Sequence, residues 1–355
     1  MDKYRIDSHK LMYHPERVAD WLKGEQIYPV YMEISPAGSC NHRCIYCALD
    51  FMEYQPRFLD TVVLKKRLKE MGKLGVKSIM YAGEGEPFLH KDIADIIKST
   101  KMSGIDAAVT TNGVLFNKKL ADLALPYLSW IKVSINAAKA GTYAKIHRAR
   151  PEDFSKVIKN MAYAAKIRKK NGYLCALGMQ IILLPDNYKE VALLAKKAEE
   201  IGMDYLVVKP YSQHPLSKTK IFKDIKYSRY LDLAEKLKKL NNKNFNVVFR
   251  AHTMQKWDDA ERNYKNCLAL PFWAYIDAGG NVWACSMYLT NNNFCLGNIY
   301  KTEFKNIWKS KKHEGLVCWA ANKLNTDKCR VNCRMDEVNR FLWDLTHPSA
   351  HVNFI

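Results

Sequence analysis

The sequence lacks the long apolar segments that direct a chain into a membrane or out of the cell. No apolar run reaches the roughly 20 residues that a membrane-spanning helix needs. Residues 1–24 are charged and lack the apolar centre of a signal peptide. We therefore expect a cytoplasmic protein with no membrane partner. Disulfides are rare in that compartment, so the ten cysteines indicate metal or redox chemistry.

Acidic residues are scarce compared with basic ones. The chain has 36 Asp and Glu against 56 Lys and Arg, which gives a net charge of +20. Such a surplus favours anionic partners, such as phosphates, sugar nucleotides or nucleic acid. The basic runs at 65–67, 166–170 and 236–239 are dispersed over helix-like segments, as solvated helix faces commonly are. We therefore expect an anionic small-molecule substrate and no nucleic-acid partner.

The sequence does contain a compact group of cysteines, Cys40, Cys44 and Cys47, with the spacing C-x3-C-x2-C. Thiolates are soft ligands that suit iron–sulfur clusters. Three of them can bind three irons of a [4Fe–4S] cube and leave the fourth iron open to a reacting molecule. A structural zinc ion would need four ligands, usually from two separated pairs. The spacing therefore predicts a chemically active cluster.

Short apolar strands alternate with helices between residues 28 and 208. This alternation indicates a parallel sheet with βα crossovers, and its six units are too few for a closed eight-fold barrel. The cysteine loop follows the first strand, at the strand ends where barrel enzymes carry their chemistry. The expected strands are 28–35, 78–82, 106–111, 130–134, 176–184 and 205–208, and the expected helices are 14–23, 60–74, 91–103, 117–123, 152–170 and 188–201.

The cysteine spacing, with the aromatic Tyr46 directly before the third cysteine, resembles the signature of the radical S-adenosylmethionine (radical SAM) enzymes. The resemblance implies a partial (β/α)6 TIM-like barrel. It also implies that SAM binds the open iron and that one electron cleaves SAM to methionine and a 5′-deoxyadenosyl radical. This radical would abstract a hydrogen atom from the substrate, and a flavodoxin or ferredoxin would supply the electron.

Further matches to this family lie at the ends of the expected strands. The run Gly83 to Pro87 resembles the family's Gly-Gly-Glu-Pro element, which contacts the SAM amino group, with Glu84 in place of the first glycine. The run Thr110 to Gly113 resembles its Thr-Asn-Gly turn. The resemblance implies SAM contacts from Glu84, Gly85, Glu86, Thr111, Asn112, Ser134, Asn136, Arg148 and Gln180.

A second set of cysteines lies towards the end of the chain: Cys267, Cys285, Cys329 and Cys333. Two segments with alternating apolar residues, 272–277 and 281–286, predict a β-hairpin. Cys267 precedes this hairpin, and Cys285 lies on its second strand. Four thiolates from a hairpin and a later loop can hold a second, auxiliary [4Fe–4S] cluster, with zinc as the alternative. The arrangement resembles the SPASM/twitch extension of radical SAM enzymes. The shorter twitch form with one cluster fits better, because a C-x2-C-x5-C run is absent.

These assignments divide the chain into five parts. They are an N-terminal extension (1–27), a radical SAM barrel (28–215), a linker helix and strand (216–254), an auxiliary-cluster domain (255–345) and a tail (346–355). Cys175, Cys295 and Cys318 are left over, and we expect them to be packed as ordinary side chains.

The auxiliary cluster predicts an electron acceptor near the substrate. Enzymes that the chain resembles oxidise a cyclitol alcohol, epimerise sugars or modify peptides. We expect radical oxidation or epimerisation of a hydroxylated small molecule, namely a sugar, cyclitol or nucleotide sugar, with oxidation preferred. Arg250, His214 and His252 are the candidate catalytic residues, and either imidazole could act as the base because imidazole titrates near neutral pH.

Three other functions stay open. Radical modification of a peptide or protein is the first, although it normally involves a leader-binding N-terminal domain, which 27 residues are too few to form. Radical modification of RNA fits the positive charge, but no RNA-binding module is evident. A non-enzymatic iron–sulfur scaffold is the third.

Overall fold

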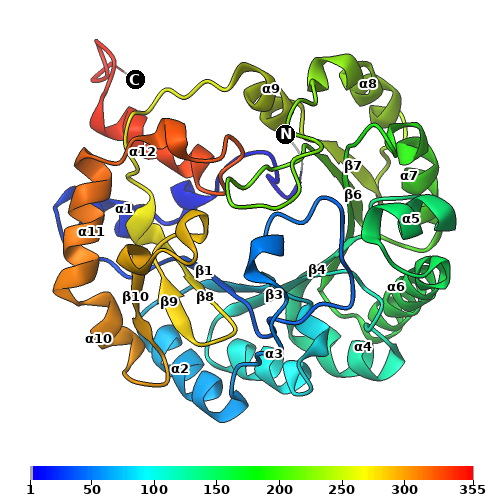
Figure 1. Ribbon diagram of the computed structural model, residues 1–355, viewed down its shortest axis with the longest axis horizontal. Coiled ribbons are helices and arrows are strands. Elements are labelled where there is room, and N and C mark those ends of the chain that lie inside the picture. Colours follow the sequence, from blue (N-terminus) through cyan, green and yellow to red (C-terminus); the bar gives the residue numbers. More distant parts are fainter. Residues whose placement is uncertain (1–2, 355) are drawn as a thin grey trace.

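The computed structural model describes residues 3–354. Its strands form one ten-stranded sheet in the order β10-β9-β8-β1-β2-β3-β4-β5-β6-β7. Figure 1 shows that this sheet curves, with helices around its outer side and long loops across its inner side. The expected α/β partial barrel is therefore confirmed.

The strands from β8 through β1 to β7 are parallel, and β9 and β10 extend the sheet beyond β8 in antiparallel fashion. The strands are β1 (Tyr31–Ile34), β2 (Ser78–Tyr81), β3 (Asp106–Thr111), β4 (Leu128–Ser134), β5 (Ala176–Ile182), β6 (Tyr205–Lys209), β7 (Asn246–Phe249), β8 (Trp273–Ile276), β9 (Asn281–Trp283) and β10 (Cys295–Asn298). All six strands expected between residues 28 and 208 are present, with ends that differ by a few residues.

Side-chain caps mark several helix starts. Asp60 accepts a hydrogen bond from Val63 N at 2.8 Å before α2, and Asn117 accepts one from Leu120 N at 3.0 Å before α4. The helices are α1 (Pro15–Leu22), α2 (Thr61–Lys73), α3 (Ile93–Met102), α4 (Lys118–Ala124), α5 (Ala140–His147), α6 (Pro151–Asn171), α7 (Val191–Glu200), α8 (Asp232–Lys238), α9 (Ala251–Asp259), α10 (Phe304–Trp308), α11 (Lys311–Asn322) and α12 (Asp336–Thr346). Within residues 3–354, no helix has the length and apolar character to cross a membrane.

The C-terminal hairpin is not a separate sheet. Its first strand, β8, pairs in parallel with β1, so that Tyr31 lies opposite Trp273 and Glu33 lies opposite Tyr275. The sequence predicts this hairpin but gives no sign of its parallel neighbour, because the two strands are more than 230 residues apart. The pairing fixes the second group of cysteines against the same sheet that holds the first.

The N-terminal segment closes one end of the barrel interior. Tyr4 and Ile6 pack against Tyr205 and Val207 of β6 and Val248 of β7. These strand residues share the inner face, because alternate side chains of a strand point to the same side of the sheet. The opposite end, at the carboxyl ends of the strands, carries the cysteine loop.

Candidate active site

The loop after β1 holds the first group of cysteines, and hydrogen bonds brace it at two places. At its base, Gly38 N donates to Arg57 O at 2.8 Å and Leu59 N donates to Pro36 O at 3.0 Å, so the two ends of the loop are joined. In its middle, Ile45 N donates to the backbone of α5. The loop is therefore held on the carboxyl ends of the parallel strands, as expected.

The three thiols of this loop lie close enough to affect one another's ionisation. Burial raises the pKa of Cys40 to about 12, and the negative charges of Glu86 and Cys47 add to the effect. Burial also raises the pKa of Cys44 and of Cys47. Neighbouring buried thiols need a cation to become thiolate ligands, and iron supplies that charge. The donor set therefore fits three irons of a [4Fe–4S] cluster.

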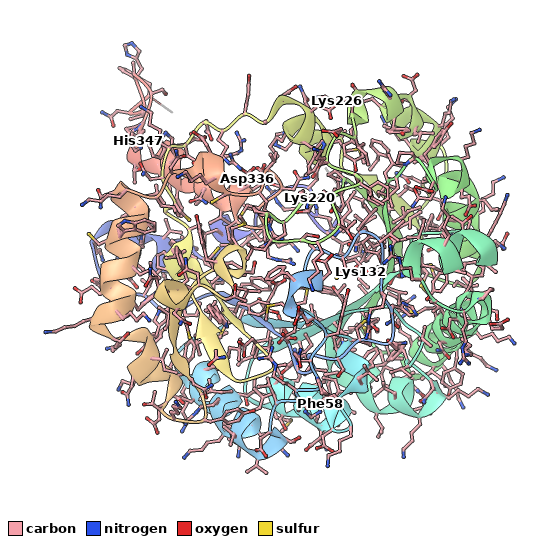
Figure 2. The ribbon with its side chains drawn as sticks, viewed as in Figure 1. Phe58, Lys132, Lys220, Lys226, Asp336 and His347 are labelled. Atoms are coloured by element: carbon pink, nitrogen blue, oxygen red, sulfur yellow. The ribbon has the colours of Figure 1, made fainter. Side chains whose placement is uncertain are left out.

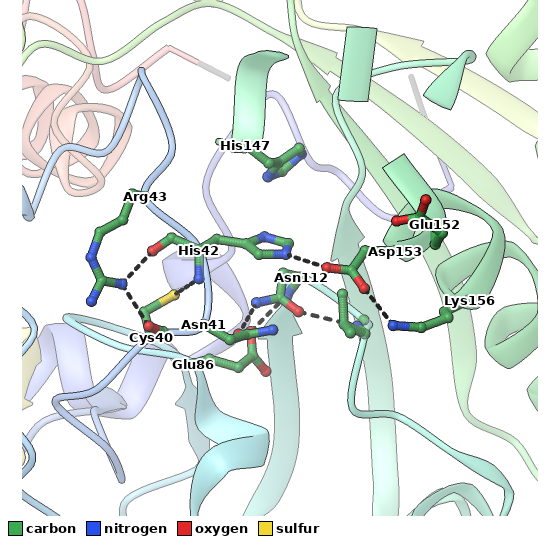
Figure 3. A network of polar contacts seen from close by, with 12 residues as sticks. Cys40, Asn41, His42, Arg43, Glu86, Asn112, His147, Glu152, Asp153 and Lys156 are labelled. Atoms are coloured by element: carbon green, nitrogen blue, oxygen red, sulfur yellow. Dashed lines mark hydrogen bonds and ion pairs between the residues drawn. The ribbon is translucent and has the colours of Figure 1, made fainter. Parts of the chain in front are cut away.

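Three of the residues expected to bind SAM gather beneath this loop. Glu86 is buried, and its carboxylate accepts hydrogen bonds from the Thr111 hydroxyl and from Asn112 N, the latter at 2.8 Å. The Asn112 side chain donates to Asn41 Oδ1 of the cysteine loop at 2.7 Å. Burial raises the pKa of Glu86 to about 7. Figure 3 shows Glu86 and Asn112 beside Cys40 and Asn41.

Gly85 allows the loop after β2 to touch the cysteine loop backbone to backbone. Glu86 N donates to Ser39 O at 2.8 Å. A Cβ atom added at Gly85 would lie 2.2 Å from Ser39 O and 2.3 Å from Ala37 O. Both are backbone atoms of the cysteine loop, so no side-chain movement could relieve such a contact. Glycine is required here by this close approach.

Glu84 is engaged with other parts of the protein. Its buried carboxylate accepts from Ala278 N at 2.6 Å and pairs with the Arg57 guanidinium at 2.8 Å. Ala278 lies in the turn between β8 and β9, and Arg57 lies at the end of the cysteine loop. Glu84 thus joins the C-terminal hairpin to the cysteine loop, while its predicted contact with SAM stays a prediction.

Asn136 forms part of a buried network behind the cysteine loop. Its side chain donates to the Tyr46 hydroxyl at 2.5 Å and accepts from Ile182 N at 2.7 Å. His147 lies beside them, with Nδ1 3.2 Å from Cys44 Sγ and Nε2 donating to Ile135 O at 3.0 Å. This network orients Cys44 and the aromatic residue of the motif.

Sequence reasoning missed two histidines at this site. His147 directly precedes Arg148 in the sequence, and His42 lies inside the cysteine motif. The two imidazole rings are neighbours in space, with centroids 5.1 Å apart. The ligand atoms of His42, Cys44 and His147 all lie within 4.8 Å of one another. Burial lowers the pKa of His42 to about 4 and that of His147 to about 3. Figure 3 shows His42 pointing towards Asp153, whose carboxylate is 3.8 Å away.

The other three residues expected to bind SAM differ in exposure: Gln180 is buried, Ser134 is partly buried and Arg148 is exposed. Gln180 of β5 donates to the Ser134 hydroxyl at the end of β4 at 3.1 Å, so these two lie together. Arg148 follows α5 in a left-handed backbone conformation, with φ of +46°, and is exposed. Contacts of all three with SAM stay predictions.

The candidate catalytic residues are not brought together. His214 is buried, with Nδ1 accepting from Leu216 N at 3.1 Å and Nε2 donating to Ser286 O at 3.3 Å. Burial lowers the pKa of His214 to about 4. His252 lies on the outside of α9 and donates to Glu337, and Arg250 pairs with Asp7.

The second group of cysteines also forms one cluster of thiols. Burial, and next the negative charge of Cys333, raise the pKa of Cys267 to about 12. Burial raises the pKa of Cys285 as well, with added effects of the other three thiols. The hairpin end and the later loop are thus brought together as expected, and the four thiols fit a second iron–sulfur cluster. Of the leftover cysteines, Cys175 is buried and Cys318 is exposed on α11.

Comparisons with known proteins agree with both groups of cysteines. A model of the radical SAM superfamily matches residues 34–198, and a model of SPASM, an iron–sulfur cluster-binding domain, matches residues 267–334. The chain belongs to the radical SAM superfamily. Within it, the chain carries a C-terminal SPASM domain, so it uses SAM, a SAM-binding [4Fe–4S] cluster and auxiliary iron–sulfur chemistry.

Individual relatives share modest identity with the chain. A GTP 3′,8-cyclase of Chlorobaculum tepidum is 27% identical over 53% of this chain and 56% of its own length, so the chain spans about half of that relative. A tungsten-containing aldehyde ferredoxin oxidoreductase cofactor-modifying protein of Pyrococcus furiosus is 23% identical over 80% and 81% of the two chains. The structure of Streptococcus suis SuiB bound to precursor peptide SuiA covers 86% of this chain and 71% of that one, with a TM-score of 0.64 and 19% identity.

Replacing Cys40, Cys44 and Cys47 together by alanine should abolish SAM cleavage, because no ligand would remain for the first cluster. Iron analysis of the anaerobically reconstituted protein should fall from about eight to about four irons per chain, the content of one remaining cube. The Cys318→Ala variant, which changes an exposed cysteine, is the control and should keep both values. Undiminished 5′-deoxyadenosine formation by the triple variant would contradict the assignment.

Replacing Gly85 by alanine should destabilise the protein by about 1–3 kcal/mol, the usual cost of overpacking. The added methyl group would collide with Ser39 O and Ala37 O, so the cysteine loop must move. Denaturant unfolding of the metal-free protein measures the effect. Gly141→Ala in α5 is the matched control, because no atom lies within 4 Å of its Cβ position. Equal stability of the two variants would show that the loops do not meet as described.

Proposed function

We propose that this radical SAM enzyme modifies a peptide or protein substrate. The observation that carries this proposal is the likeness in fold to SuiB bound to its precursor peptide, which extends over 86% of the chain. This support favours peptide modification over the oxidation or epimerisation of a sugar or cyclitol that the sequence first suggests.

The residues of the site have separable tasks in this proposal. The cluster, when bound, supplies the electron that cleaves SAM to methionine and a 5′-deoxyadenosyl radical, which abstracts a hydrogen atom. Cys40, Cys44 and Cys47 hold this cluster, and Tyr46 and His147 orient the loop from behind. Tyr4 and Ile6 of the N-terminal segment pack against the inner face at the end of the barrel away from the cysteine loop, where they would limit the access of water to a reactive radical.

An anionic small molecule is the second candidate substrate. Two relatives are named for nucleotide chemistry, a GTP 3′,8-cyclase and an S-adenosylmethionine-dependent nucleotide dehydratase. Basic side chains on the inner face of the barrel, such as Lys132 and Lys209, also favour a substrate with negative charge. Hydrogen abstraction from a sugar carbon of a nucleotide would satisfy both observations.

Transfer of deuterium to 5′-deoxyadenosine distinguishes the two candidates, because the label reveals which molecule loses its hydrogen. The reconstituted enzyme is incubated with SAM and dithionite, which replaces the predicted flavodoxin or ferredoxin donor. One reaction contains peptides from proteolysed, fully deuterated bacterial protein, and another contains GTP deuterated in its ribose. We expect mass spectrometry to detect labelled 5′-deoxyadenosine only with the peptides.

The triple alanine variant of the first cysteine group provides the control, since it should form no 5′-deoxyadenosine from either mixture. Label from GTP alone would replace the peptide proposal by the nucleotide one. Unlabelled 5′-deoxyadenosine in both reactions would exclude both substrate pools.

A further inference from the structure

Basic side chains from four parts of the chain meet inside the barrel. Lys132 lies on β4 and shares its face of the strand with Ser134, which bonds across to β5. The intervening residues of β4, Ile131 and Val133, are fully buried under the helices. Lys132 therefore points inwards, and Figure 2 shows it within the ring of helices. Lys209 ends β6 on the same inner face as Val207.

Three arginines lie near the ends of other elements: Arg250 directly follows β7, and Arg330 and Arg334 belong to the auxiliary cysteine loop. After burial, the largest effect on Lys132 comes from Arg334 and Arg250, and Lys209 is affected by Lys132 and all three arginines. These five cations thus form one electrostatic group, which we call the inner basic group. Lys10 adds a further positive charge near Lys132.

Only two of the five cations have a carboxylate partner in the described part of the chain. Arg334 pairs with Glu33 of β1, and Arg250 pairs with Asp7. Lys132 and Lys209 form no hydrogen bond or ion pair through their ammonium groups within residues 3–354; Lys132 only faces the Trp130 ring at 5.3 Å. Arg330 donates one hydrogen bond, to the Ser286 hydroxyl at 3.3 Å, and its Nε is buried without a partner.

Uncompensated positive charge of this kind is costly inside a protein. Burial, together with the neighbouring arginines, lowers the pKa of Lys132 to about 7 and that of Lys209 far below its usual range. Two half-buried lysines without partners thus weaken the folded state. Such arrangements occur where a bound ligand offsets their cost.

We propose that Lys132, Lys209 and Arg330 form an oxyanion-binding subsite, which holds a carboxylate or phosphate group of the substrate inside the barrel. The inference rests on the proposed function only in placing the substrate there. Lys132 lies two residues before Ser134, at the strand end expected to meet SAM, and Arg330 directly follows Cys329 of the auxiliary group. An anion held by these three residues would position the substrate between the two iron–sulfur sites.

The test measures thermal unfolding of the reconstituted holoenzyme with increasing sodium phosphate or sodium acetate at constant ionic strength. A specific anion raises the melting temperature in a saturable way. Lys132→Met and Lys209→Met, singly and together, should weaken the binding of at least one anion by roughly tenfold or more, as expected for lost charge-assisted hydrogen bonds. Without anions, Lys132→Met should melt at a higher temperature than the natural protein, because a costly buried charge is gone.

Two further variants complete the design. Lys196→Met removes an exposed lysine from α7 and should leave the anion response unchanged, while Lys132→Arg keeps the charge and should retain most of it. If phosphate raises the melting temperature more than acetate does, the subsite holds a phosphate group of the substrate. If acetate raises it more, the subsite holds a carboxylate, as in an acidic peptide. Equal anion responses of the natural protein and the double methionine variant would overturn the subsite. Because this assay needs no SAM cleavage, its failure is distinct from failure of the peptide proposal.

Discussion

The double pairing of β1 is the constraint on which both cysteine sites depend. Glu33, in the middle of this strand, lies opposite Met80 of β2 on one side and opposite Tyr275 of β8 on the other. The cysteine loop continues from β1, the loop containing Gly85 continues from β2, and the hairpin turn at Ala278 continues from β8. Backbone hydrogen bonds of one parallel sheet therefore set the spacing between the SAM-binding loop and the auxiliary-cluster region.

Much of this arrangement could be predicted from local sequence patterns. The strand and helix alternation, the cap at Asp60 and the two cysteine groups each depend on residues close together in the chain. The pairing of β1 with β8 and the contact of Glu84 with Ala278 could not be predicted, because they join segments whose spacing carries no pattern. His147 was missed for a related reason, since only the fold of α5 brings it to Cys44.

The net charge of the chain likewise could not predict which basic residues lie inside the barrel. Lysines on the outer helices, such as Lys65 and Lys101, pair with nearby acidic residues at the surface, where such pairs contribute little. Lys132 and Lys209 stand outside every basic run of the sequence. A count of charges does not distinguish surface lysines from lysines inside the barrel, whereas the fold shows which lysines belong to the inner basic group. The basic runs are themselves not uniformly solvated, because Arg67 of the first run is buried and donates to Ile299 O at 3.0 Å.

The parallel pairing of β1 with β8 also has a consequence for how the protein is made. A ribosome releases residues 31–34 long before residues 273–276, so one edge of β1 stays open during most of synthesis. Open strand edges invite pairing with other chains, and contacts between distant segments form slowly. Over the same interval Glu84 lacks its contact with Ala278, so the cysteine loop is not yet joined to the C-terminal hairpin. The nascent chain thus passes through a stage in which the segment with three cysteines directly follows a strand with an unpaired edge.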